Sequence, residues 1–279
     1  MGVLVLGSSG MLGSMVLYTL REAGVDSVVG TQSEDAKAPG FFDALEGVEA
    51  LEHFCHAGDT VINCIGITSL HVTSMPDALV RAIEINAAFP HRLALFAKQY
   101  GLRVIHMSTD GVFAPSREPH VETDASDAID LYGRTKALGE AVSECVINIR
   151  TSIVGPSPKG ESLLQWFLSQ PKGATVHGYT DVLWTGVTTR QFAQLCLKLI
   201  SEETFQRWRD FSAIYHFVPN APVSKLGLLE QFRDTFRPDI TVVATNSPQQ
   251  AGGRVLRTQY PEWERFVGRA DLPSALKEL

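Results

Sequence analysis

The chain has 279 residues, of which 44% are hydrophobic and 20% charged, so it can bury a large core. Its net charge of -7, without any run of Lys or Arg, argues against a nucleic-acid partner. The apolar run Val3–Leu6 follows no basic segment, and no apolar stretch reaches the roughly 20 residues that cross a bilayer. We therefore expect a cytoplasmic protein with no membrane span.

The cysteines are far apart in the sequence and form no CxxC pair. No His lies near them at a spacing typical of a zinc site. We expect reduced thiols and no metal ligands at these positions, which are Cys55, Cys64, Cys145 and Cys196.

The first half of the chain alternates short apolar runs with amphipathic stretches, which is typical of parallel strands joined by crossover helices. Strands are predicted at Val3–Leu6, Val28–Val29, Val61–Cys64, Val104–Met107 and Val146–Ile149. Helices are predicted at Met11–Ala23, Ala78–Tyr100 and Leu131–Glu144. The pattern indicates an α/β fold with a doubly wound parallel sheet, and in such sheets ligands bind beyond the carboxyl ends of the strands.

Beyond Arg150 this rhythm loosens, with helices predicted at Leu163–Leu168, Arg190–Ile200 and Lys225–Phe236. We interpret residues 1–150 as a cofactor-binding domain and residues 151–279 as a smaller C-terminal α/β substrate domain. Segments at about 182–192 and 213–218 are expected to return to the main sheet, through strands around Val182–Trp184 and Ile214–Phe217.

A glycine-rich turn follows the first strand and opens the first helix. Its glycines permit a tight turn, and the helix N-terminus offers N–H donors to a pyrophosphate. The alternative is that these glycines only allow the strand and helix to pack closely. The predicted cofactor contacts are Gly7, Ser9, Gly10, Met11, Leu12 and Gly13.

The residue at the end of the second strand normally indicates whether NAD or NADP is bound, because a carboxylate there binds the ribose of NAD and repels the 2′-phosphate of NADP. This chain has Gly30–Ser33 there and no carboxylate before Glu34. We expect NADPH, with NADH as the alternative. Thr31 and Gln32 are predicted to contact it.

Two other loops complete the predicted cofactor site. Asp43 could meet the adenine, or be an ordinary loop aspartate. Cys64, Ile65 and Gly66 follow the third strand and are predicted to face the cofactor.

Tyr132 and Lys136 are four residues apart in a predicted helix, so both face one ligand. A tyrosine hydroxyl has a pKa of about 10, and we expect the Lys136 ammonium to lower it and to hold the cofactor ribose. The alternative for an isolated YxxxK is a surface tyrosine beside a solvated lysine.

Ser108, Thr109 and Asp110 follow the strand Val104–Met107, where a hydroxyl can hydrogen-bond a reacting carbonyl. Thr109 is the candidate for this role, and the alternative is a cluster that caps a turn. Asn86, in the preceding helix, could anchor a proton-relay water near the cofactor or have a purely local role.

The chain resembles the extended short-chain dehydrogenases, and among them the dTDP-4-dehydrorhamnose reductase-like sugar-nucleotide reductases. The resemblance is carried by GSSGMLG at Gly7–Gly13, VINCIG at Val61–Gly66, INAAFPHRLA at Ile85–Ala94, HMSTDGVF at His106–Phe113, YGRTKALGE at Tyr132–Glu140, IRTSIVG at Ile149–Gly155 and LWTGVTT at Leu183–Thr189.

This resemblance implies a Rossmann-type sheet and a catalytic set of Thr109, Tyr132 and Lys136. It implies NAD(P)H-dependent reduction of the 4-keto group of a nucleotide-diphospho-4-keto-6-deoxy sugar, in deoxysugar and cell-surface polysaccharide biosynthesis. By this mechanism the C4 carbonyl takes a hydride on carbon and the Tyr132 proton on oxygen.

The resemblance also implies a substrate site on the sugar or diphosphate side, for which a buried ion pair and a tight turn are the alternatives. Its predicted residues are Ser108, Thr109, Asp110, Arg150, Thr151, Ser152, Gly186, Val187 and Thr188. The chain departs from the family at Gly111, where the family has Tyr, and at Ile153, where it has Trp. Both changes alter the expected hexose pocket.

Two other functions stay open. A dehydratase or epimerase would regenerate its cofactor in each cycle, but Gly111 stands where a 4,6-dehydratase has a Glu. A non-catalytic regulatory subunit would keep the cofactor site, but the presence of both Tyr132 and Lys136 argues against it. A homodimer and a magnesium ion on the substrate phosphates are left open, although no residues indicate either.

Overall fold

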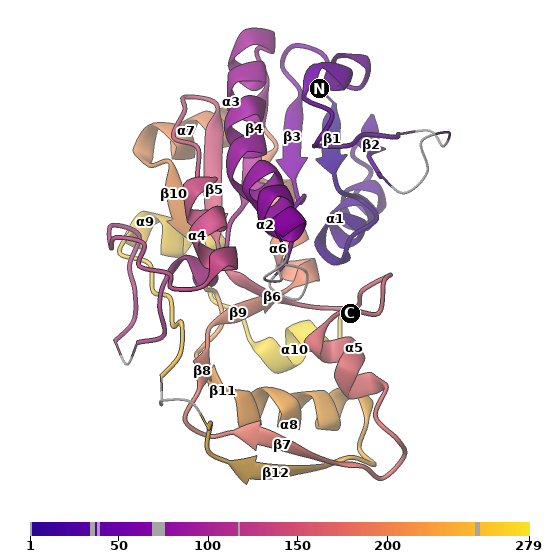
Figure 1. Ribbon diagram of the computed structural model, residues 1–279, viewed down its shortest axis with the longest axis vertical. Coiled ribbons are helices and arrows are strands. Elements are labelled where there is room, and N and C mark those ends of the chain that lie inside the picture. Colours follow the sequence, from indigo (N-terminus) through magenta and orange to yellow (C-terminus); the bar gives the residue numbers. More distant parts are fainter. Residues whose placement is uncertain (1, 34–36, 38–39, 69–75, 117, 249–251) are drawn as a thin grey trace.

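The computed structural model describes residues 2–33, 37, 40–68, 76–116, 118–248 and 252–279. A parallel sheet forms the upper body in Figure 1. Its strands are β1 (Val3–Leu6), β2 (Val28–Gly30), β3 (Thr60–Asn63), β4 (Arg103–Met107), β5 (Val146–Arg150) and β10 (Ile214–His216). The strands predicted from the first half of the sequence all appear, each within one residue of its expected bounds.

The strand order is β2-β1-β3-β4-β5-β10, and every pair is parallel. The chain first adds β2 on one side of β1 and then crosses to add β3 on the other. The carboxyl ends of β1 and β3 therefore flank the point where the strand order reverses, which is where open α/β sheets bind ligands.

The two faces of the sheet are covered because successive strand residues point to opposite sides. Val3 and Val5 pack with helices α1 (Met11–Glu22) and α6 (Thr189–Leu199). Leu4 and Leu6 pack on the other face with α3 (Phe89–Tyr100). The predicted Rossmann-type doubly wound α/β class is confirmed.

The helix predicted at Ala78–Tyr100 consists of α2 (Pro76–Ala82), a π-helical stretch at Ile83–Ala88, and α3. The π-helical stretch contains Asn86, and such stretches are frequent at functional sites. The tertiary contacts of this side chain, described below, explain why the sequence pattern alone did not reveal the interruption.

The helix α4 (Leu131–Leu138) ends earlier than the predicted Glu144. Gly139 lies close to the π-helical stretch that precedes α3. A Cβ atom on Gly139 would be only 1.9 Å from the Asn86 carbonyl oxygen. The chain leaves the helix there, and Glu140 turns into the protein interior to bond Arg150.

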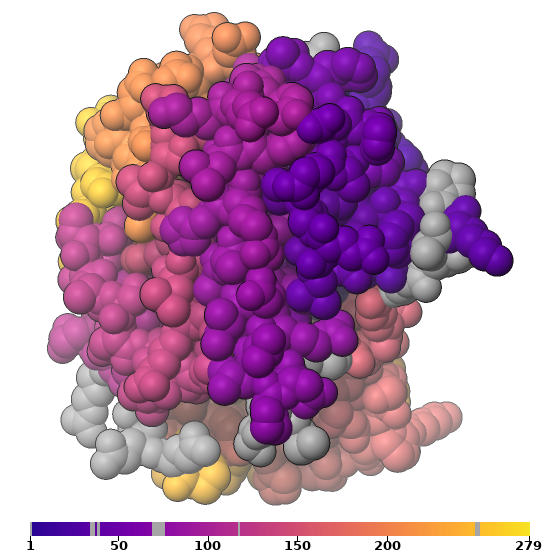
Figure 2. Space-filling view, turned by 45° about the horizontal axis from the view of Figure 1, so that its top comes forward, coloured from indigo at the N-terminus to yellow at the C-terminus, as the bar shows by residue number. Residues whose placement is uncertain are grey.

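The lower body in Figure 1 has its own hydrophobic core, around Phe167, Leu228 and Phe232. Its helices are α5 (Leu163–Leu168), α8 (Lys225–Phe236) and α10 (Leu272–Leu276). Its strand pairs are β7 (Thr175–Tyr179) with β12 (Thr241–Thr245), β8 (Leu183–Trp184) with β11 (Val223–Ser224), and β6 (Ser152–Val154) with β9 (Gly186–Thr188). Segments of the N-terminal half, indigo to magenta, cover most of the face shown in Figure 2.

The chain returns to the upper body after β9. Strand β10 pairs with β5, and helices α6, α7 (Glu202–Phe211) and α9 (Pro261–Val267) contribute to the core of the upper body. The expectation that Val182–Trp184 adds a strand to the main sheet was wrong, because β8 pairs with β11. From segment 182–192, Val187 of β9 and the first part of α6 join the hydrophobic core on one face of the sheet. Among the described residues, no helix is long and apolar enough to cross a membrane.

Candidate active site

A cleft of about 1240 Å³ lies at the carboxyl edge of the main sheet and extends to the lower body. Of the residues predicted for the site, those that line it are Gly10, Met11, Leu12, Cys64, Ile65, Gly66, Ser108, Thr109, Asp110, Tyr132, Lys136, Thr151 and Ser152. These residues come from helices, a strand and loops that are far apart in the sequence, and the structure brings them to one side of the molecule.

The turn after β1 is built for close backbone approach. Gly7 has φ +74°, and a Cβ at Gly13 would lie 2.2 Å from the Gly7 carbonyl oxygen, so no larger residue fits there. The first helical hydrogen bond runs from Ser14 N to Gly10 O, and no side chain caps this helix. The N–H groups of the first turn are thus available to a phosphate, which fits a dinucleotide cofactor.

The end of β2 supports this turn. The buried Thr31 accepts hydrogen bonds from Gly7 N at its Oγ1 (3.2 Å) and from Ser8 N and Ser8 Oγ at its carbonyl oxygen (2.8 Å each). Thr31 therefore positions the turn, and its assignment as a cofactor contact stays a prediction. The sequence prediction did not foresee this cross-strand bond.

The other predicted adenine-side residues lie outside the cleft lining. Gln32 pairs through its backbone with Gly40 and Phe42. The Asp43 carboxylate accepts a hydrogen bond from Leu45 N (2.9 Å), the contact of an ordinary loop aspartate. Of the residues predicted in the glycine turn, Gly10, Met11 and Leu12 line the cleft, whereas Gly7, Ser9 and Gly13 do not.

Thr109, Tyr132 and Lys136 converge on the cleft. Thr109 Oγ1 accepts from Gly111 N (3.0 Å) and donates to Asp110 Oδ1 (3.1 Å), and its side chain is close enough to Tyr132 to lower the pKa of the phenol. Lys136 Nζ donates to the Met107 carbonyl oxygen (2.6 Å) at the end of β4. Two hydroxyl groups and an ammonium group thus face the space beyond β4.

Burial sets the protonation of these groups. It raises the pKa of Tyr132 to about 12; the hydrogen bond with Thr109 opposes this increase, and the charge of Asp110 adds to it. Burial also lowers the pKa of Lys136 to about 8, against the attraction of Glu140. Burial is the largest cause of the increase at Tyr132, and the expectation that Lys136 lowers the pKa of Tyr132 stays a prediction. At neutral pH the phenol is protonated and the ammonium charged.

Ser108 is held from behind the cleft. Its hydroxyl donates to Glu140 Oε1 (2.6 Å), and Glu140 forms a two-bond ion pair with Arg150, through Nε (2.7 Å) and Nη2 (2.6 Å). Both charged side chains are about 95% buried. Arg150 is thus a buried ion-pair partner, which is the alternative left open from the sequence, and it lies outside the cleft lining.

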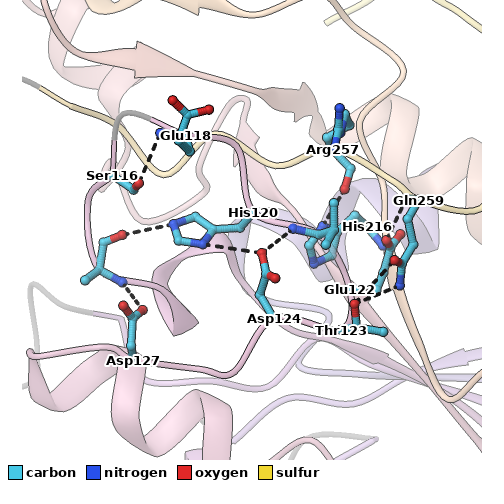
Figure 3. Close-up of polar contacts among 12 residues, drawn as sticks. Ser116, Glu118, His120, Glu122, Thr123, Asp124, Asp127, His216, Arg257 and Gln259 are labelled. Carbon is cyan, nitrogen blue, oxygen red and sulfur yellow. Dashed lines mark hydrogen bonds and ion pairs between the residues drawn. The ribbon is translucent and has the colours of Figure 1, made fainter.

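Arg150 also joins a buried network shown partly in Figure 3. Its Nη1 lies 3.5 Å from His216 Nε2, and His216 Nδ1 lies 3.0 Å from the Arg257 carbonyl oxygen. The Glu122 carboxylate accepts from His216 N (3.0 Å) and Gln259 N (2.9 Å). These bonds fasten the loop between Thr109 and Tyr132 to β10 and to the C-terminal segment.

The Asn86 side chain is fully bonded inside the protein. Its Oδ1 accepts from Ile67 N (2.8 Å), and its Nδ2 donates to Ile67 O (2.9 Å) and Thr135 Oγ1 (3.2 Å). Asn86 does not line the cleft and holds the Gly66–Ile67 loop against α4, and its assignment as a cofactor contact stays a prediction.

Gly186 and Thr188 also have structural roles. A Cβ at Gly186 would lie 1.9 Å from Trp184 Cζ2, so this glycine admits the indole ring. Thr188 is the buried N-cap of α6 in a capping box with Gln191. Both lie outside the cleft lining, and their assignment as substrate contacts stays a prediction, whereas Ser152 lines the cleft and accepts from Trp184 Nε1 (2.8 Å).

Several site residues were missed from the sequence. Asp130 is the N-cap of α4, accepting from Gly133 N (2.8 Å), and Arg254 Nη2 donates to its other carboxylate oxygen (2.9 Å). An Asp before a predicted helix is a recognisable cap signal. No local signal marks Arg254, Trp184 or Lys225, which reach the cleft from the distant C-terminal half.

The described residues contain no group of three or more His, Cys, Asp or Glu that could hold a metal ion. The cysteine thiols in this part of the chain are unpaired, and burial raises the pKa of the Cys64 thiol in the cleft. Cys64 is therefore a protonated, unreactive neighbour of Lys136.

The chain matches the model of the family described as RmlD substrate binding domain over residues 1–261. It is 29% identical over 192 residues to a dTDP-4-dehydrorhamnose reductase of Mycobacterium tuberculosis, with 65% of this chain and 58% of that protein aligned. The match thus spans less than two thirds of that relative's length.

Two solved structures share the fold. A dTDP-4-dehydrorhamnose reductase from Clostridium acetobutylicum has a TM-score of 0.81 and 22% identity, with 100% of this chain and 98% of that chain covered. One from Bacillus anthracis, in complex with NADP, has a TM-score of 0.78 and 16% identity, with 100% and 97% covered.

Proposed function

The chain belongs to the family described as RmlD substrate binding domain, and on this premise we propose that it is a sugar-nucleotide reductase. It uses NADPH, with NADH as the alternative, to reduce the 4-keto group of a nucleotide-linked 4-keto-6-deoxy sugar such as dTDP-4-dehydrorhamnose. The observation that carries the proposal is the convergence of Thr109, Tyr132 and Lys136 on one cleft beside the glycine turn.

The cofactor fits the residues around the turn. The first-turn N–H groups of α1 would hold its pyrophosphate, and the ammonium of Lys136 would hold its ribose. A bound nicotinamide supplies the hydride for the reduction. The absence of a carboxylate at Gly30–Ser33 supports NADPH as the preferred form.

The chain's own residues supply the proton and fix the carbonyl. Tyr132 is protonated at neutral pH because burial raises its pKa to about 12, so it can donate a hydrogen bond to the C4 oxygen and then its proton. The Thr109 hydroxyl, beside Tyr132, would turn its proton from Asp110 Oδ1 to this oxygen and so donate a second hydrogen bond to it. The charged Lys136 stabilises the phenolate that remains.

Tyr132→Phe tests this function because it removes the proton donor and keeps the ring. We expect kcat for NADPH oxidation, followed at 340 nm with a panel of nucleotide-linked 4-keto-6-deoxy sugars, to fall by about 100-fold to 10,000-fold. Binding of NADPH should not change. The exposed Tyr18→Phe, on the outer face of α1, is the matched control and should keep full activity.

Other outcomes separate the alternatives. Conversion of the sugar without net NADPH oxidation would indicate an epimerase or dehydratase. An inert protein that binds NADPH tightly, and whose biological activity survives Tyr132→Phe, would indicate a non-catalytic subunit.

A further inference from the structure

The lower wall of the cleft carries a positive charge that the proposed reaction does not use. This wall is formed by β8 (Leu183 and Trp184), by the preceding residue Val182, and by Lys225, the first residue of α8, which carries the charge. The backbone of Lys225 is fixed, because its N–H donates to the Val182 carbonyl oxygen (2.9 Å).

Trp184 gives the Lys225 side chain a rigid platform. The indole is 5% exposed, donates from Nε1 to Ser152 Oγ, and packs against the backbone of Gly186. Lys225 Nζ lies 5.4 Å from the centroid of this ring, within the range of a cation–π contact. The ammonium is therefore held over the ring at the cleft and not extended into bulk water.

Lys225 differs from two other cations of the cleft in its hydrogen bonds. Lys136 donates to the Met107 carbonyl, and Arg254 bonds Asp130 and the Phe113 carbonyl. Within the described part of the chain, the Lys225 ammonium has neither a hydrogen-bond acceptor nor a carboxylate within ion-pair distance.

The electrostatics agree with this geometry. Burial lowers the pKa of Lys225, and the more distant carboxylate of Asp110 only partly compensates. Removing an ammonium from water without a close partner costs free energy. A ligand oxygen with a negative charge would restore the missing hydrogen bonds, and charge-assisted bonds are the strong ones.

We propose that the Lys225 ammonium binds an anionic oxygen of the substrate and so helps determine which sugar nucleotides the cleft accepts. This proposal rests on the proposed function only for the class of substrate. The oxygen belongs either to the diphosphate or to an acidic group on the sugar, and binding measurements separate these two sources.

The test uses Lys225→Met, which removes the charge and keeps most of the length, and Lys225→Arg, which restores a charge. Lys172→Met, at an exposed position outside the cleft lining, is the matched control. Dissociation constants are measured by calorimetry in the presence of saturating NADPH, with dTDP, UDP-glucose and UDP-glucuronic acid as probes.

We expect Lys225→Met to weaken binding by about tenfold to a hundredfold, Lys225→Arg to recover part of the loss, and Lys172→Met to match the wild type. Weaker binding of all three probes assigns the contact to the diphosphate. Weaker binding of UDP-glucuronic acid alone assigns it to an acidic group on the sugar.

The proposal is overturned if Lys225→Met binds every probe as the wild type does, or if the wild type binds none of them. Failure of the proposed function gives a different result, namely no NADPH oxidation with any keto sugar while the Lys225-dependent binding persists. A steady-state measurement adds a second readout, because the loss should appear in KM for the sugar nucleotide and leave KM for NADPH unchanged.

Discussion

Two arginine–carboxylate pairs hold the two ends of helix α4, and they differ in their access to water. Arg150 and Glu140, beyond the C-terminal end, have side chains that are 4% and 5% exposed. Arg254 and Asp130, at the N-terminal end, are 33% and 42% exposed. The first pair lies behind Ser108, while the second lines the cleft beside Tyr132.

Because their exposure to water differs, these two ion pairs have different roles. A buried pair contributes to stability mainly because losing one partner leaves the other charge without water or a counterion. An exposed pair contributes little to stability, but it can fix the direction of a helix end that carries a catalytic group. We expect the buried pair to control folding and the exposed pair to control activity.

The largest expected effect follows from Arg150→Met, which leaves the Glu140 carboxylate buried without its partner. We expect the free energy of unfolding to fall by about 3–5 kcal/mol, measured from urea denaturation followed by circular dichroism. The comparison variant Arg254→Met should lose less than about 1 kcal/mol. Equal losses in the two variants would contradict the distinction between the pairs.

The pH dependence of stability should come from the buried network. Burial lowers the pKa of His216 to about 4, whereas an unfolded histidine titrates near about 6.5. The unfolded state therefore binds more protons between these values, so stability should fall as the pH drops from about 6.5 to 4. Urea denaturation at a series of pH values measures this slope.

His216→Gln sharpens the test because an amide can hydrogen-bond without titrating in this range. The pH dependence of its stability should be flatter than that of the wild type between pH 6.5 and 4. Parallel curves for the two proteins would assign the slope to other groups.

The smallest effect is expected from Arg254→Met, and it should appear in catalysis. Asp130 keeps its bond to Gly133 N, so α4 stays capped, but the first turn with Tyr132 loses one anchor. We expect kcat/KM to fall by about tenfold, mainly through kcat. The control is Arg265→Met, which breaks an exposed pair with Glu262 outside the cleft and should leave kcat/KM unchanged. Wild-type kinetics in Arg254→Met would show that this pair has no positioning role.

The strands of the first half and the convergence of Tyr132 and Lys136 on one cleft could be predicted from the sequence because their signals are local. Each strand is a short apolar run, and the turn at Gly7–Gly13 needs glycines for its own geometry. Tyr132 and Lys136 share a helix face at a spacing of four residues. These features depend on few distant partners, so the sequence pattern and the structure agree.

The departures from the predicted site share a different cause. Arg150, Asn86 and Thr31 are polar residues of the type that binds ligands, and each is hydrogen-bonded to a distant segment of the chain. The early end of α4 has the same origin, because Gly139 lies against the Asn86 carbonyl. A local pattern cannot distinguish a polar group that faces a ligand from one that faces another strand.

By itself, the sequence determined the α/β class and the glycine turn, since local patterns specify them, and its resemblance to a known family singled out Thr109, Tyr132 and Lys136. Only the tertiary structure decided the rest of the cleft. It brought Trp184, Lys225 and Arg254 from the C-terminal half to the edge of the main sheet, and it turned Arg150 inward. The physical reason is that burial and charge pairing depend on which distant segments meet, and these contacts form only when the chain has folded.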